Sequence, residues 1–100
     1  MLEDNYLETL EKLAAPTMDM HRALSFLAQE ISSVDAYNQR YDACTDPELR
    51  LIIGHHRDKK KALIAMLLEW VRRRDVVFDK HLHHSLFKAG PITAPIQSEE

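Results

Sequence analysis

The chain has 100 residues, of which 45% are hydrophobic and 29% are charged, and its formal net charge is −3. These values fit one small globular domain and exclude collagen-like and disordered chains. The longest apolar run, residues 62–68, is far shorter than the roughly 20 residues that span a bilayer. A single cysteine cannot form an internal disulfide, and the acidic balance argues against nucleic acid as the main partner. We therefore predict a single cytoplasmic domain over residues 1–100 that binds neither membrane nor nucleic acid.

Proline residues and a capping motif divide most of the chain into two long predicted helices. Pro16 precedes Thr17, which we predict to be the N-cap of a helix over residues 17–44. The sequence TDPE at 45–48 matches a Thr-x-x-Glu capping box with proline in the first turn, so a second helix is predicted over residues 46–75. Because the second helix follows the first directly, the two must form an antiparallel hairpin.

A shorter third helix is predicted over residues 79–89, followed by a tail over residues 90–100. Gly90-Pro91 is a stop signal typical of a helix C-terminus. The sequence contains no alternating β-branched run and no hairpin dipeptide, so no strand is predicted. The predicted fold class is all-α, with a two-helix hairpin and a short C-terminal helix.

Each long helix carries a seam of mainly apolar residues at heptad spacing. The first seam consists of Met20, Leu24, Leu27, Ile31, Val34, Asn38 and Tyr41, and the second of Leu49, Ile53, His56, Lys60, Leu63, Leu67 and Trp70. A bare pair of helices, each about 40 Å long, would leave much of both seams in water. We therefore predict that two hairpins dimerise into a four-helix bundle. The predicted interface residues are Leu27, Ile31, Leu67 and Trp70.

Two charged residues lie in or beside these seams. Lys60 falls within the second seam, where an unpaired ammonium is costly. Glu30 lies on the flank of the first seam, and Tyr37 follows almost directly above it two turns later. The basic triplets at 59–61 and 72–74 are otherwise spread around the helix, so most of their charges are expected to be solvated.

Five stretches together carry a family resemblance: VDAYNQR at 34–40, TDPEL at 45–49, HHRD at 55–58, MLLEW at 66–70 and GPITA at 90–94. In a constant register from about residue 21 to 94, they resemble the encapsulated ferritin family. The resemblance implies two-helix chains that dimerise into a ferritin-like four-helix bundle and assemble further into a ring. It also implies an encapsulin shell around them and oxidation of ferrous iron at a di-iron centre on the dimer interface.

The resemblance implies iron ligands that both chains supply: a glutamate in the first helix and a Glu-x-x-His pair in the second. Glu30 matches the first ligand and is the only one retained. Lys60 and Leu63 stand at the positions of the pair, while Tyr37 beside the centre is kept. An ammonium and an alkyl group offer no lone pairs to a metal. We therefore interpret these four residues as vestigial metal-site positions, with no catalytic residue among them.

Three further positions depart from the family in the same way. The resemblance implies acidic residues of a secondary iron-attracting site where Gln29 and Ser32 stand, and a tryptophan where Ala36 stands. We predict an assembly protein without a working ferroxidase centre or cofactor, with a structural or regulatory role connected to iron storage. Its predicted partners are a second copy of itself, in a dimer or a ring of dimers, and an encapsulin shell protein. The alternative is an iron-binding ferroxidase that uses a residual or rearranged di-iron site.

The resemblance also suggests why a lysine lies in the seam. Glu30 and Lys60 converge on the implied dimer interface, so we expect Lys60 to occupy the space of the lost metal and to pair with Glu30 across the bundle. The alternative is that Lys60 extends out of the seam and Glu30 is solvated. Among the histidines, we expect His56 in the core or the interface. His81 and His84, one turn apart, could hold a divalent metal but are expected to be exposed histidines without such a role.

Overall fold

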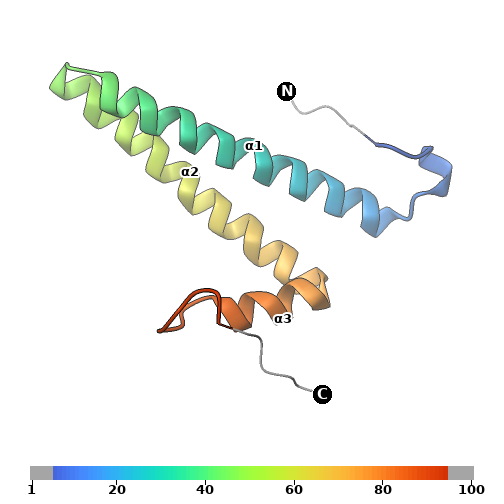
Figure 1. Cartoon of the computed structure of the whole chain (residues 1–100). Helices are drawn as coiled ribbons and strands as arrows, with labels where there is room; N and C mark the ends of the chain where they lie inside the picture. Colours follow the sequence, from blue (N-terminus) through green and yellow to red (C-terminus); the bar gives the residue numbers. More distant parts are fainter. Residues whose placement is uncertain (1–5, 95–100) are drawn as a thin grey trace.

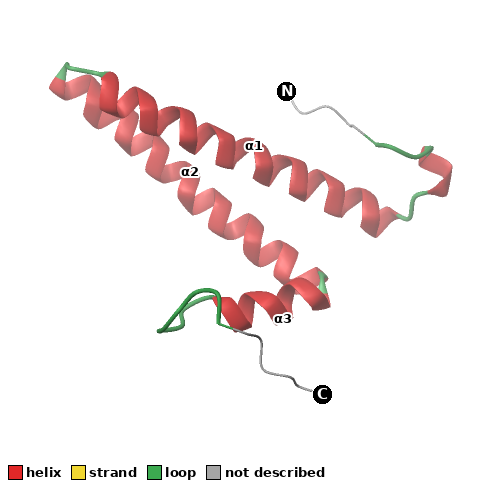
Figure 2. Cartoon of the chain, viewed as in Figure 1, coloured by secondary structure: helices red, strands yellow, loops and turns green. Residues whose placement is uncertain are grey.

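The structure, a computed structural model, describes residues 6–94 and contains three α-helices and one short 3-10 helix (Figure 1). The elements are η1 (Leu10–Lys12), α1 (Ala15–Ala43), α2 (Pro47–Arg74) and α3 (Val76–Ser85). No strand occurs in the described part of the chain (Figure 2). The all-α class and the hairpin with a short C-terminal helix are therefore confirmed, whereas dimerisation into a four-helix bundle stays a prediction.

The two long helices run antiparallel, close together at the connecting loop and further apart towards the start of α1 and the end of α2 (Figure 1). The loop is short because α1 ends directly before Cys44, whose backbone N–H donates to the carbonyl of Arg40 at 3.0 Å. Asp46 then starts α2 by accepting a 2.8 Å hydrogen bond from the backbone N–H of Leu49. None of the helices within residues 6–94 has the length and apolar character needed to cross a bilayer.

The N-terminal caps of both long helices differ from the sequence-based predictions. Thr17 is not the N-cap of α1, because the helix begins at Ala15 and includes Pro16 in its first turn. Proline fits there, since the first N–H groups of a helix have no intrahelical acceptor to lose. In α2 the capping side chain is Asp46 rather than Thr45. Its carboxylate is a favoured N-cap acceptor and stands directly before the proline.

Both ends of α3 lie earlier than residues 79–89. The start is set by Asp75, whose carboxylate accepts a 2.8 Å hydrogen bond from the backbone N–H of Phe78. The same residue has extended backbone angles and ends α2, so the two helices meet at a one-residue elbow. At the other end, Phe87 takes a positive φ of 59° directly after the C-cap residue. The chain therefore leaves the helix well before Gly90-Pro91, the predicted stop.

The interior between α1 and α2 is narrow. Within residues 6–94, the buried residues are Ala23, Leu27, Glu30, Gly54 and Val71. Many large apolar side chains on the two long helices remain exposed, and examples are Leu24, Ile31, Leu49, Ile52 and Met66. A single hairpin thus leaves much apolar surface in water, as the two seams indicated.

Candidate functional site

The middle of the hairpin holds one buried carboxylate and its partner. Glu30 lies in the middle of α1 and Lys60 in the middle of α2, and the antiparallel arrangement brings them together. The Lys60 Nζ atom donates a hydrogen bond to Glu30 Oε1 at 2.9 Å, and the two charges form an ion pair. The Glu30 side chain is only 9% exposed, and that of Lys60 is 22% exposed. The expected pair is present, but it joins the two helices of one chain rather than two chains across a bundle.

The ion pair offsets the free-energy cost of burying each charge alone. Burial of a carboxylate or an ammonium without a partner destabilises the fold by roughly several kcal/mol, because the charge loses its hydration. The Lys60 ammonium supplies both an opposite charge and a hydrogen-bond donor to Glu30. Lys60 therefore has a defined structural role in the second seam, and the alternative in which it extends into water does not describe this chain.

The donor chemistry at this position does not fit ferrous iron. Glu30 offers a carboxylate, but Lys60 is a cation without a lone pair and Leu63 is an alkyl side chain. A divalent cation about 4 Å from a unit positive charge is repelled by roughly 8 kcal/mol at an effective dielectric constant of 20. A metal ion could approach Glu30 closely only after the ammonium had moved away.

Tyr37 and Leu63 stand at the two other metal-site positions that the resemblance implies. The ring of Tyr37 meets the ring of His56 edge to face, with centroids 4.9 Å apart, and the guanidinium of Arg40 lies 5.1 Å from the Tyr37 centroid. His56 is exposed in this chain, so its expected place in the core is wrong, and its place in an interface stays a prediction. Leu63 is half-buried and lines a groove between α1 and α2.

The predicted interface residues divide into two groups. Leu27 is buried inside the hairpin, whereas Ile31 is 52% exposed. Leu67 and Trp70 are half-buried and line the same groove as Leu63, which has a volume of about 420 Å³ between the diverging ends of α1 and α2. Ile31 and this groove are available for contact with a second chain, and the interface itself stays a prediction.

Histidine, cysteine and acidic side chains do not gather into a metal site within one chain. Among residues 6–94, no group of three or more of them is placed to hold a metal ion. His81 and His84 on α3 belong to no such group. The site implied by the resemblance draws its ligands from two chains, so the misfit of iron at Glu30 follows from the donor chemistry of the residues there.

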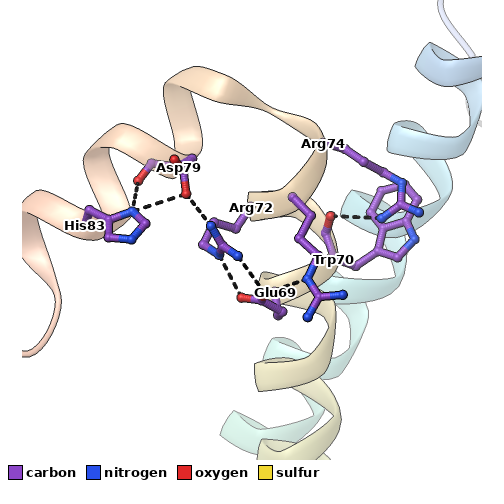
Figure 3. A network of polar contacts seen from close by, with 7 residues as sticks. Glu69, Trp70, Arg72, Arg74, Asp79 and His83 are labelled. Atoms are coloured by element: carbon purple, nitrogen blue, oxygen red, sulfur yellow. Dashed lines mark hydrogen bonds and ion pairs between the residues drawn. The ribbon is translucent and has the colours of Figure 1, made fainter.

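Sequence reasoning missed a second polar cluster, which connects α2 to α3 (Figure 3). Glu69 accepts two 2.8 Å hydrogen bonds from Arg72 and one of 2.7 Å from Arg73. Arg72 also reaches Asp79 on α3, which in turn contacts His83. The hydrogen bonds from Arg72, and then those from Arg73, lower the pKa of Glu69 to about 2. The spacing of Glu69 from the two arginines, three and four residues, was the available signal.

The chain is similar to known proteins over most of its length. The sequence model of the EncFtn-like family matches residues 5–89. An encapsulated ferritin-like protein of Rhodospirillum rubrum is 49% identical over 87 residues, which cover 87% of this chain and 62% of that protein. A ferritin-like protein of Thermotoga maritima is 39% identical over 92 residues, which cover 92% of this chain and 81% of that one. This chain therefore spans less than two thirds of the length of the Rhodospirillum protein.

Similarity extends to a solved structure. The crystal structure of a protein from Nitrosomonas europaea matches with a TM-score of 0.86 at 49% sequence identity. The match covers 91% of this chain and 100% of that chain. Most of this chain thus has the same fold as an experimentally determined structure.

Proposed function

Because the chain belongs to the encapsulated ferritin family, we propose that it is a ferritin-like assembly protein without a working ferroxidase centre. Its role would be structural or regulatory and connected to iron storage. The observation that carries the proposal is the ion pair in which Lys60 binds the buried carboxylate of Glu30 at 2.9 Å. This pair stands where the resemblance implies that a carboxylate faces iron.

The charges at Glu30 and Lys60 support loss of activity rather than a rearranged site. The ammonium of Lys60 supplies the positive charge that a metal would otherwise supply to Glu30, so this carboxylate needs no metal to be compensated. Leu63 removes the imidazole that would complete the ligand set. Family membership persists when a site changes, so the family name alone does not carry the activity.

We further propose that the chain acts as a dimer, or as a ring of dimers, in which two hairpins form a four-helix bundle. The exposed apolar side chains of α1 and α2 support this assembly, because a second hairpin would remove them from water. Residence in the cytoplasm, inside an encapsulin nanocompartment, is the corresponding proposal for location. Its support is the family relationship.

The proposal is tested by aerobic addition of ferrous iron to the purified chain, followed by the ferric absorbance and by elemental analysis. We expect oxidation at the rate of protein-free buffer and little or no retained iron. A variant that combines Lys60→Glu with Leu63→His restores the implied ligand set and is expected to gain iron binding. Lys59→Glu is the matched control, because it makes the same charge change at an exposed neighbouring position.

Oxidation well above the buffer rate by the unmodified chain would contradict the proposal and favour the ferroxidase alternative. Glu30→Gln would then decide whether that activity uses the position of the ion pair. If activity survived this substitution, the iron would be oxidised elsewhere on the chain.

A further inference from the structure

The short helix α3 depends on α2 for its stability. It has ten residues, Val76–Ser85, and isolated helices shorter than about 12 to 15 residues are marginal in water. Asp75 caps its first turn by accepting a hydrogen bond from the backbone N–H of Phe78, but this bond does not connect α3 to the side of α2. The helical state of α3 therefore rests on contacts across the elbow.

Apolar contacts across the elbow are incomplete. A cleft of about 540 Å³ lies between α2 and α3, with Ala65 and Leu68 on one side and Leu82 and Leu86 on the other. At the start of α3, Val76 is 83% exposed. The apolar surfaces of the two helices are thus brought near each other without closing into a core, which leaves a large share of the docking to polar contacts.

Arg72 is placed to supply that polar contact (Figure 3). Its Nε and Nη2 atoms donate to the two carboxylate oxygens of Glu69, each at 2.8 Å. The remaining terminal nitrogen, Nη1, donates to Asp79 Oδ1 on α3. Two-pronged binding by Glu69 fixes the plane of the guanidinium, so the third donor is directed at Asp79. On α3, Asp79 is also within 3.2 Å of the ring of His83.

We propose that Arg72, oriented by Glu69, is an electrostatic latch that holds α3 against α2 through Asp79, and that breaking the latch undocks α3. Isolated exposed ion pairs contribute little, but two-pronged arginine pairs within a network are the recognised exception. The latch residues Glu69 and Arg72 also line the cleft, so the same contact sets the shape of its walls. Because the groups are partly exposed, salt should weaken the latch.

The test is hydrogen–deuterium exchange of the full chain at neutral pH, read separately for α1 and α3. Arg72→Met and Asp79→Asn should each speed exchange in α3 by about fivefold or more. Arg73→Met is the matched control, because Arg73 donates to the same Glu69 and this contact lies within α2. It should change α3 exchange by less than about twofold, and none of the three should alter α1.

Combining Arg72→Met with Asp79→Asn separates the latch from other roles of Asp79. Asp79 lies in the first turn of α3, where a negative charge also favours the helix dipole. If loss of the latch is the main effect, α3 should exchange in the double variant at the rate of either single variant, because both substitutions remove the same contact between Arg72 and Asp79. About 0.5 M sodium chloride should speed α3 exchange in the unmodified chain and leave Arg72→Met nearly unchanged.

Three results would overturn the latch. The first is equal α3 exchange in Arg72→Met and Arg73→Met, which would make the effect one of helix α2 alone. The second is additive effects in the double variant, and the third is no response of the unmodified chain to salt. If Arg72→Met also sped exchange in α1, its effect on α3 would reflect general unfolding of the chain. The latch would then be tested by Asp79→Asn and by the salt response of the unmodified chain.

Discussion

The Lys60 ammonium and the Glu30 carboxylate form an ion pair of unequal burial: the glutamate side chain is 9% exposed and the lysine side chain is 22% exposed. The two partners therefore differ in what they can do when the other is removed. A lysine can turn its long side chain towards water, whereas a short buried carboxylate cannot. Removal of Lys60 should therefore destabilise the chain more than removal of Glu30.

This asymmetry gives a prediction for stability. Lys60→Met should lower the free energy of unfolding by about 3 kcal/mol, because it leaves a buried carboxylate without a partner. Glu30→Gln should lower the free energy of unfolding by less. The double variant Lys60→Met with Glu30→Gln should be more stable than Lys60→Met alone, since no charge is then buried. Urea unfolding of the three variants measures this, with Lys59→Met as the exposed control. A loss for Lys60→Met no larger than that of the control would mean that Glu30 is solvated.

Gly54 in α2 gives a prediction of unusual sign. Gly→Ala inside a helix normally stabilises by about 1 kcal/mol. Here a Cβ atom would lie 3.0 Å from Cε1 of the Tyr41 ring, and the guanidinium groups of Arg50 and Arg57 lie 4.3 and 4.8 Å from the centroid of that ring. The ring cannot shift without disturbing these contacts, so Gly54→Ala should be neutral or destabilising in thermal unfolding.

A second background separates helix propensity from crowding at this position. In Tyr41→Ala the ring is absent, so Gly54→Ala should regain the usual stabilisation. Equal effects of Gly54→Ala in the two backgrounds would show that Tyr41 does not restrict the site.

Glu69 gives a prediction for pH dependence. Hydrogen bonds from Arg72 and Arg73 lower its pKa from 4.5 to about 2 in the folded chain. A lowered folded pKa means that the stabilisation is complete above the unfolded value and is lost as pH falls towards 2. The stability difference between the unmodified chain and Glu69→Gln should therefore be constant near neutral pH and shrink between about pH 4.5 and 2. Urea unfolding at a series of pH values measures this difference. If it did not shrink with acid, the charge of the Glu69 carboxylate would not be its cause.

Exposed apolar residues on both long helices give a prediction for assembly. Ile31, Leu49 and Met66 are all exposed in the single hairpin. Burial of such side chains against a second copy is favourable, so the chain should be at least a dimer at micromolar concentration. Light scattering measures the mass directly. A particle of 11.6 kDa, the mass of one chain, would show that the hairpin is stable with its seams in water.

Much of the hairpin follows from local sequence signals, but the elbow does not. The proline before Glu48 and the heptad seams predict two antiparallel helices. The pairing of Lys60 with Glu30 was expected from the family resemblance, and across two chains, whereas the structure has it within one chain. The start of α3 was misplaced because Asp75 acts at once as the end of one helix and the cap of the next. The contact between Arg72 and Asp79 depends on the angle at this residue, which no periodic pattern encodes.

The helix caps show the same limit on a smaller scale. Thr45 satisfies the capping-box pattern, yet Asp46 provides the acceptor for the backbone N–H of Leu49. Both residues have suitable side chains, and the choice depends on where the chain leaves α1. The pattern therefore predicts a helix start within one or two residues, whereas the identity of the capping side chain needs the structure.

The proposal that Lys60 compensates Glu30 in place of a metal can be tested by anaerobic calorimetric titration with ferrous ion. The titration is made on the unmodified chain and on the variant that combines Lys60→Glu with Leu63→His. We expect no saturable binding by the unmodified chain and saturable binding by the variant, because the variant removes the repelling ammonium and adds two donors. Saturable binding of ferrous ion by the unmodified chain, abolished by Glu30→Gln, would show that Lys60 does not replace a metal at Glu30.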